Sequence, residues 1–177
     1  INFADYPVYK GNDLGLTYTP GGSIFKTWSP VATEMELIFY DDGMNGREIS
    51  RHKMSKEKNG VWQANLQMDI KDRFYTFRTK INGAWMNEIT DPYAKAVGVN
   101  GTRAMVIELN ETDPPDWEND ISPAFINPTD AVIYELHVRD ASISPVSGIK
   151  NKGKFLGLTE SGTKNENGFS TGVDHIK

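Results

Sequence analysis

Ala131-Val-Ile-Tyr-Glu-Leu-His-Val-Arg-Asp140 is a continuous β-prone, mostly apolar run that ends in a charged pair. A strand buried on both faces has this composition, because helices cover each side of a parallel sheet. A long Gly-, Ser- and Lys-rich loop follows, and then a helix is predicted near Val173, with Thr171 as its N-cap. A single strand-loop-helix unit cannot bury its own strand. We therefore expect a complete module followed by the first piece of a larger domain.

Length and composition narrow the class of protein. With 177 residues, the chain can hold one full domain and part of a second. Its net charge of −5 argues against a nucleic-acid partner, because phosphate binding needs a basic face. The absence of cysteine excludes disulfides and thiolate metal sites. No apolar run is long enough to cross a bilayer, no signal peptide is visible, and no compartment is favoured.

Residues 14–109 consist of short apolar stretches separated by turn residues, and Asn-Gly pairs occur here at Asn45, Asn59, Asn82 and Asn100. Asn-Gly favours tight hairpin turns with positive φ. Large apolar residues alternate with polar ones, which is typical of antiparallel sheets with one wet face. The spacing predicts an immunoglobulin-like β-sandwich. Its expected strands are residues 14–19, 23–28, 35–40, 47–53, 61–68, 74–82 and 104–109.

A linker is predicted at residues 112–128, between a sandwich module at 1–111 and the start of a second domain at 129–177. The linker contains four prolines, and residues 108–120 carry six acidic residues and no Lys or Arg. Proline stiffens such a segment and removes ladder hydrogen bonds. Because Trp117, Phe125 and Ile126 interrupt its polarity, we expect it to lie along a surface, with Trp117 as an anchor.

The chain shows no phosphate-binding loop, metal motif or nucleophile elbow, and we expect no catalytic residue, metal site or cofactor in it. Glu135 and His137 share one face of the predicted strand. Two such residues are too few for a metal site, so we expect a structural hydrogen-bonded pair. His52 is expected on the surface.

The tryptophans divide into two groups. Trp28 and Trp62 lie in apolar strand patterns and are expected in the core. Trp85 follows the Asn82-Gly83 turn, beside a strand face that carries Arg78, Lys80 and Asn82. An indole with hydrogen-bond donors beside it can pack on the C–H face of a sugar while the polar groups bind its hydroxyls. The alternative is that Trp85 simply covers the end of the sandwich.

Six stretches of the sequence look familiar together. Two are short, Phe25-Lys-Thr-Trp-Ser-Pro30 and Gly60-Val-Trp62, and they resemble strands of a family 48 carbohydrate-binding module. Four are longer: Asp91-Pro-Tyr-Ala-Lys-Ala-Val-Gly-Val-Asn-Gly101, Tyr134-Glu-Leu-His-Val-Arg-Asp140, Gly153-Lys-Phe-Leu-Gly-Leu-Thr-Glu-Ser-Gly-Thr163 and Ser170-Thr-Gly-Val-Asp-His-Ile-Lys177. These resemble, in the same order, type I pullulanases, which carry such a module before a family 13 glycoside hydrolase domain. The resemblance covers nearly the whole chain apart from the first dozen residues.

The resemblance implies that residues from about 129 begin a (β/α)8 barrel, whose remainder would be the module's partner. It implies that the complete enzyme hydrolyses α-1,6 branch linkages in pullulan, glycogen or branched dextrins, with retention and two carboxyl groups. Those carboxylates lie on later barrel strands in the family, so we do not expect Glu135 or Asp140 to be a catalytic carboxylate. The 177-residue chain alone is expected to be inactive.

The resemblance also bears on the sugar site. Trp85 matches one of two platform tryptophans of glycogen-binding relatives, and Arg78 falls where a Lys assists; Asn82 completes the expected set. The second platform Trp would lie near Tyr40-Asp-Asp-Gly43, where this sequence has none. The module is therefore expected either to bind branched α-glucan or to brace the barrel. Two alternatives remain: an isoamylase-like debranching or branching enzyme, and a stand-alone glycan-binding module.

Overall fold

The structure is a computed structural model that describes residues 2–177. The chain divides into two compact units, one that ends at Asn119 and a second, Asp120–Lys177. The division lies inside the predicted linker. Within the described residues, no helix is both long and apolar enough to cross a membrane.

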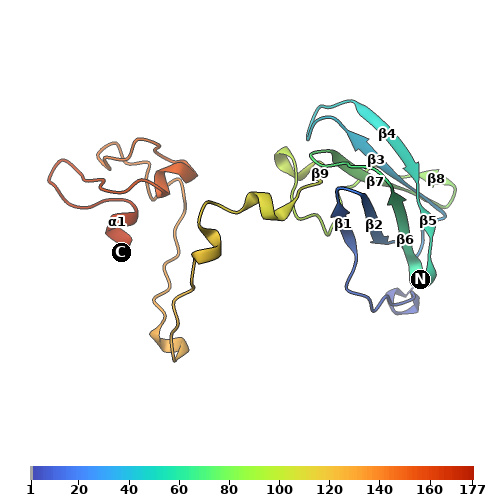
Figure 1. The fold of residues 1–177 in the computed structure, drawn as a ribbon, viewed down its shortest axis with the longest axis horizontal. Helices are drawn as coiled ribbons and strands as arrows, with labels where there is room; N and C mark the ends of the chain where they lie inside the picture. The colour runs from blue at the N-terminus through green and yellow to red at the C-terminus, as the bar shows by residue number, and fades with distance from the viewer. Residues whose placement is uncertain (1) are drawn as a thin grey trace. The chain divides into compact units, whose positions relative to one another are not determined.

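The first unit is an all-β sandwich of two antiparallel sheets (Figure 1), as the alternation predicted. The first sheet has the order β1 (Gly15–Thr19), β2 (Gly22–Trp28), β6 (Val61–Leu66), β5 (Ser55–Lys56). The second has the order β4 (Glu48–Lys53), β3 (Glu34–Tyr40), β7 (Phe74–Ile81), β8 (Ala84–Trp85), and β9 (Ala104–Met105) also pairs with β7. The strand predicted at residues 104–109 is thus only two residues long, as β9.

The core lies between the sheets and is built from one side of each strand. Phe25 of β2 packs edge-on against Tyr75 of β7, with ring centroids 4.9 Å apart. Trp62 is buried as predicted, with its indole N–H donating to Ser29 O at 2.9 Å. Trp28 is not a core residue: it points to the other side of β2 and packs edge-on against Phe3 and Tyr6. Alternation determined its side of the strand, but the N-terminal aromatics that cover it are not visible in the strand pattern.

Three of the four Asn-Gly pairs in this unit have the predicted positive φ, at Asn59, Asn82 and Asn100. Asn82 and Gly83 both have positive φ between β7 and β8, which is the geometry of a type I′ hairpin turn. Asn45 does not, because its backbone N–H and that of Met44 instead donate to the carboxylate of Asp42. The β7–β8 hairpin is the turn that positions the candidate site.

The predicted strand at residues 131–140 is absent, and no residue of this stretch pairs in a sheet within residues 2–177. Val132 and Ile133 are 94% and 90% exposed, because the described residues provide no neighbouring strand to cover them. The linker side chains Trp117, Phe125 and Ile126 are exposed as well, and Trp117 is the least exposed of the three.

The rest of the second unit is a folded loop around buried Ile149 that ends in the short helix α1 (Val173–Ile176). The carboxylate of Glu160 accepts the backbone N–H groups of Lys150 and Asn151, each at 2.8 Å. The helix begins where predicted, but Gly172 and not Thr171 is its N-cap. The Thr171 hydroxyl donates to Ser147 O instead.

Candidate functional site

The candidate site lies on the outer face of the second sheet, which we define as the face turned away from the core. Antiparallel pairing places Trp85 of β8 directly opposite Lys80 of β7, and Arg78 is two residues along β7 on the same face. The hairpin therefore brings two predicted site residues together: the Arg78 guanidinium carbon is 5.5 Å from the centroid of the Trp85 ring. Asn82 lies in the exposed turn itself, and no contact of its side chain with those two is recorded among the described residues.

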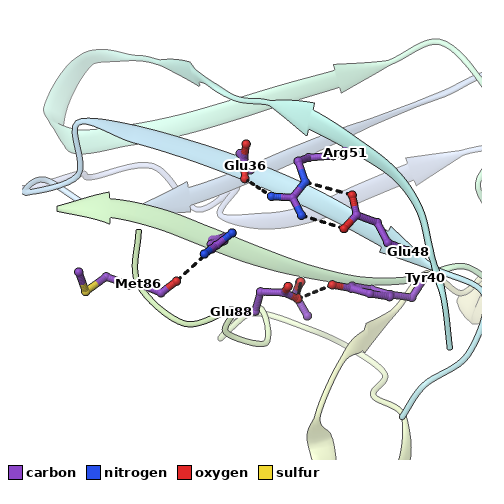
Figure 2. Close-up of polar contacts among 8 residues, drawn as sticks. Glu36, Tyr40, Glu48, Arg51, Met86 and Glu88 are labelled. Carbon is purple, nitrogen blue, oxygen red and sulfur yellow. Dashed lines mark hydrogen bonds and ion pairs between the residues drawn. The ribbon is translucent and has the colours of Figure 1, made fainter. Parts of the chain in front are cut away.

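Both cations beside Trp85 are held in place by other groups. Arg78 Nε donates to Met86 O at 3.1 Å, as Figure 2 shows. Lys80 Nζ is 5.7 Å from the Trp85 centroid and donates to Glu34 Oε1 at 2.7 Å. This hydrogen bond lowers the pKa of Glu34. The indole is thus half-buried against two fixed cations, an arrangement in which a cation–π attraction orients the ring.

A charged cluster continues across β3 and β4 on the same face (Figure 2). Arg51 donates to Glu36 at 2.6 Å and clamps Glu48 with two bonds of 2.8 and 3.0 Å. The Arg51 clamp lowers the pKa of Glu48. Ile38, directly opposite Arg51, is fully buried although it points outward. The aliphatic stem of Arg51 is placed to cover it, so we assign this cluster a structural role.

Sequence reasoning missed a second polar group on this face, formed by Tyr40, Thr76 and Glu88. Glu88 Oε2 accepts the hydroxyl of Tyr40 at 2.6 Å and that of Thr76 at 2.7 Å. Burial, with the Glu88 hydrogen bond second, raises the pKa of Tyr40 to about 12, so Tyr40 remains a donor at neutral pH. The only available signal was that Tyr40 and Thr76 both fall on the outward side of their strands.

The segment at residues 40–43, where the resemblance places a second platform tryptophan, has Tyr40 as its only aromatic residue. Tyr40 is only 6% exposed, and the Arg103 guanidinium carbon lies 3.5 Å from its ring centroid. Arg103 is held there by Asp42 O at 2.6 Å and Gly46 O at 3.3 Å. The tyrosine ring is therefore covered and offers no open stacking surface.

The other predicted features do not assemble into a site. No hydrogen bond joins Glu135 and His137 in the described structure, so the predicted pair is wrong; His137 Nδ1 instead lies 3.5 Å from Asp140 Oδ2. Both residues line an open cavity of about 750 Å³ in the second unit. Among residues 2–177, no three His, Cys, Asp or Glu residues are grouped to hold a metal ion. His52 is half-buried, with its ring edge-on to Phe39 at 5.8 Å, and not a free surface residue.

Comparison with known proteins identifies the families that this chain resembles. The model of "Carbohydrate-binding module 48 (Isoamylase N-terminal domain)" matches residues 13–94, which contain all three predicted site residues. The pullulanase of Bacillus subtilis (strain 168) is 38% identical over 173 residues, which cover 98% of this chain and 23% of that protein.

Solved structures agree. The pullulanase of Paenibacillus barengoltzii in complex with maltohexaose and α-cyclodextrin has a TM-score of 0.90 and 50% identity over 96% of this chain and 26% of that one. The pullulanase of Bacillus acidopullulyticus has a TM-score of 0.89 and 39% identity over 97% of this chain and 21% of that one. The chain thus spans about a quarter of the length of these relatives, and their catalytic domain is not covered by it.

Proposed function

We propose that the complete protein hydrolyses α-1,6-glucosidic branch linkages in pullulan, glycogen or branched dextrins. The reason is that this chain corresponds to the N-terminal region of a pullulanase, which carries the family 48 module. The observation that carries the proposal is that the similarity to pullulanases is not confined to the sandwich. It extends across 98% of the chain, including the stretch at residues 131–140 that the sandwich does not use.

In this proposal residues 1–111 are the accessory module, 112–128 the linker, and 129–177 the first part of a (β/α)8 barrel. The exposed Val132 and Ile133 support the last assignment, because such a run is stable only when neighbouring strands and helices cover it. The two carboxyl groups that a retaining glycosidase needs would come from beyond residue 177. The chain by itself is then inactive.

The module's own role in the proposal is to bind α-glucan through Trp85, Arg78 and Asn82. The half-buried indole provides an apolar surface for a pyranose ring, and Arg78 and Asn82 provide hydrogen-bond donors beside it. A second candidate role is to brace the barrel. The covered Tyr40 ring favours it, because a platform with one aromatic residue binds sugar less strongly than one with two.

Two measurements test these proposals. A reducing-sugar assay of the complete protein on pullulan and on amylose should show release from pullulan and none from amylose. Calorimetric titration of the 177-residue chain with maltoheptaose should give a dissociation constant below about 1 mM, which is roughly −4 kcal/mol, if the module binds glucan. An absence of binding would leave bracing as its role.

A further inference from the structure

The outer face of the second sheet holds a hydrogen-bond acceptor at the end of β7 away from Trp85. This acceptor is Glu88, whose Oε2 is fixed by Tyr40 at 2.6 Å and Thr76 at 2.7 Å. Tyr40 and Thr76 are themselves nearly fully buried, so the carboxylate is held by rigid partners although Glu88 itself is exposed. Its second oxygen, Oε1, has no hydrogen bond recorded within the described residues.

Along β7, Arg78 lies between Thr76, which binds Glu88, and Lys80, which is paired with Trp85. Its Nε is used by Met86 O at 3.1 Å, whereas no hydrogen bond of its two terminal nitrogens is recorded in the described part of the chain. The guanidinium can therefore donate to a ligand while it is held in orientation. Along β7 the face thus presents the apolar ring of Trp85, then the donors of Arg78, then the acceptor Glu88.

The spacing of these groups sets the size of the ligand. Trp85 is opposite Lys80, and Glu88 is bonded to Thr76, four residues along the same strand. At about 3.3 Å per residue, the two ends are separated by roughly 13 Å along β7. A single pyranose ring cannot contact both ends, whereas a chain of several sugar units can.

We propose that Glu88 is a second glucan-contacting residue, and that with Trp85 and Arg78 it makes the module selective for malto-oligosaccharides long enough to span β7. This inference rests on the proposed glucan-binding function of the module. The carboxylate accepts a hydrogen bond from a hydroxyl of a sugar unit away from the one that packs on Trp85. Because the carboxylate is already oriented, little side-chain entropy is lost on binding, and its negative charge disfavours anionic ligands.

The test compares maltotriose with maltoheptaose by calorimetric titration of the 177-residue chain. Glu88→Ala should weaken maltoheptaose binding about tenfold, the loss expected for one hydrogen bond to a charged group, and should leave maltotriose binding within about twofold. Glu88→Gln keeps an oxygen for Tyr40 and Thr76 but turns an amide donor toward the ligand, so it should give a similar loss without disturbing the fold. Glu57→Ala, at an exposed carboxylate preceding β6 of the other sheet, is the matched control and should change neither affinity.

The outcomes separate this inference from the function on which it rests. If Trp85→Ala weakens both sugars but neither Glu88 variant changes the ratio of the two affinities, the role of Glu88 is wrong and the glucan site stands. If wild type binds neither sugar, or Trp85→Ala changes nothing, the glucan-binding function itself is wrong and the Glu88 inference fails with it.

Discussion

The hydroxyl of Tyr75 donates a hydrogen bond of 2.8 Å to Asp91 Oδ2 inside the sandwich. Tyr75 is fully buried, Asp91 is 3% exposed, and the other carboxylate oxygen accepts the backbone N–H of Tyr93 at 2.9 Å. The bond therefore ties the segment that follows β8 back to the start of β7. Burial raises the pKa of both groups.

Tyr75→Phe should lower the free energy of unfolding by about 1–3 kcal/mol, because it leaves one buried carboxylate oxygen of Asp91 without a partner. Urea denaturation followed by tryptophan fluorescence measures it. The control is Tyr18→Phe, which removes a bond of the same length to exposed Asp69, where water can replace the hydroxyl. We expect less than about 0.5 kcal/mol there. Equal losses in the two variants would show that burial of the Asp91 pair has no energetic consequence.

Asp91→Asn should change how stability depends on pH. Because the folded-state pKa of Asp91 is raised by burial, its contribution to stability is fully present below the unfolded-state pKa of about 4 and is lost as pH rises through the folded-state pKa. An amide at this position does not titrate, so the stability of the variant relative to wild type should increase from about pH 3.5 towards neutrality. Carboxylates with lowered pKa, such as Glu34 and Glu48, act oppositely but equally in both proteins. A difference that is constant with pH would contradict the raised pKa.

Trp85→Ala should weaken maltoheptaose binding by at least about tenfold, because it removes the apolar surface on which a sugar ring packs. Titration calorimetry measures the affinity, and unchanged circular dichroism would show that the sandwich is intact. Trp117→Ala is the matched control, since Trp117 is 53% exposed and lies outside the second sheet. Equal affinities for the Trp85 variant and wild type would remove Trp85 from the site.

Gly83→Ala should destabilise the β7–β8 hairpin by roughly 1 kcal/mol. Gly83 has a φ of +80° and an added Cβ would meet no atom within 4 Å, so the cost is purely that of the left-handed backbone. Gly21→Ala, also in open space but without positive φ, should be neutral or slightly stabilising. Thermal unfolding of both variants measures the difference. A Gly83 variant as stable as the Gly21 variant would contradict the type I′ turn.

The sequence by itself determined the two-sheet sandwich, most of its strands, and the turn that carries Asn82 and Gly83. It also brought Arg78 and Trp85 onto one face. These features follow from alternation along single strands and from the φ preference of Asn-Gly, which are local properties. The similarity of residues 131–140 to a barrel strand was likewise visible in the residues alone.

Tertiary structure decided what covers each face. Arg103 lies on Tyr40, and Glu88 joins Tyr40 to Thr76, through contacts between residues distant in the chain that no strand pattern encodes. Trp28 lies outside the core for the same reason. It packs against Phe3 and Tyr6 of the N-terminal segment, which are distant from it in the chain. The stretch at residues 131–140 forms no strand, since sheet hydrogen bonds need a partner strand, and residues 2–177 supply none.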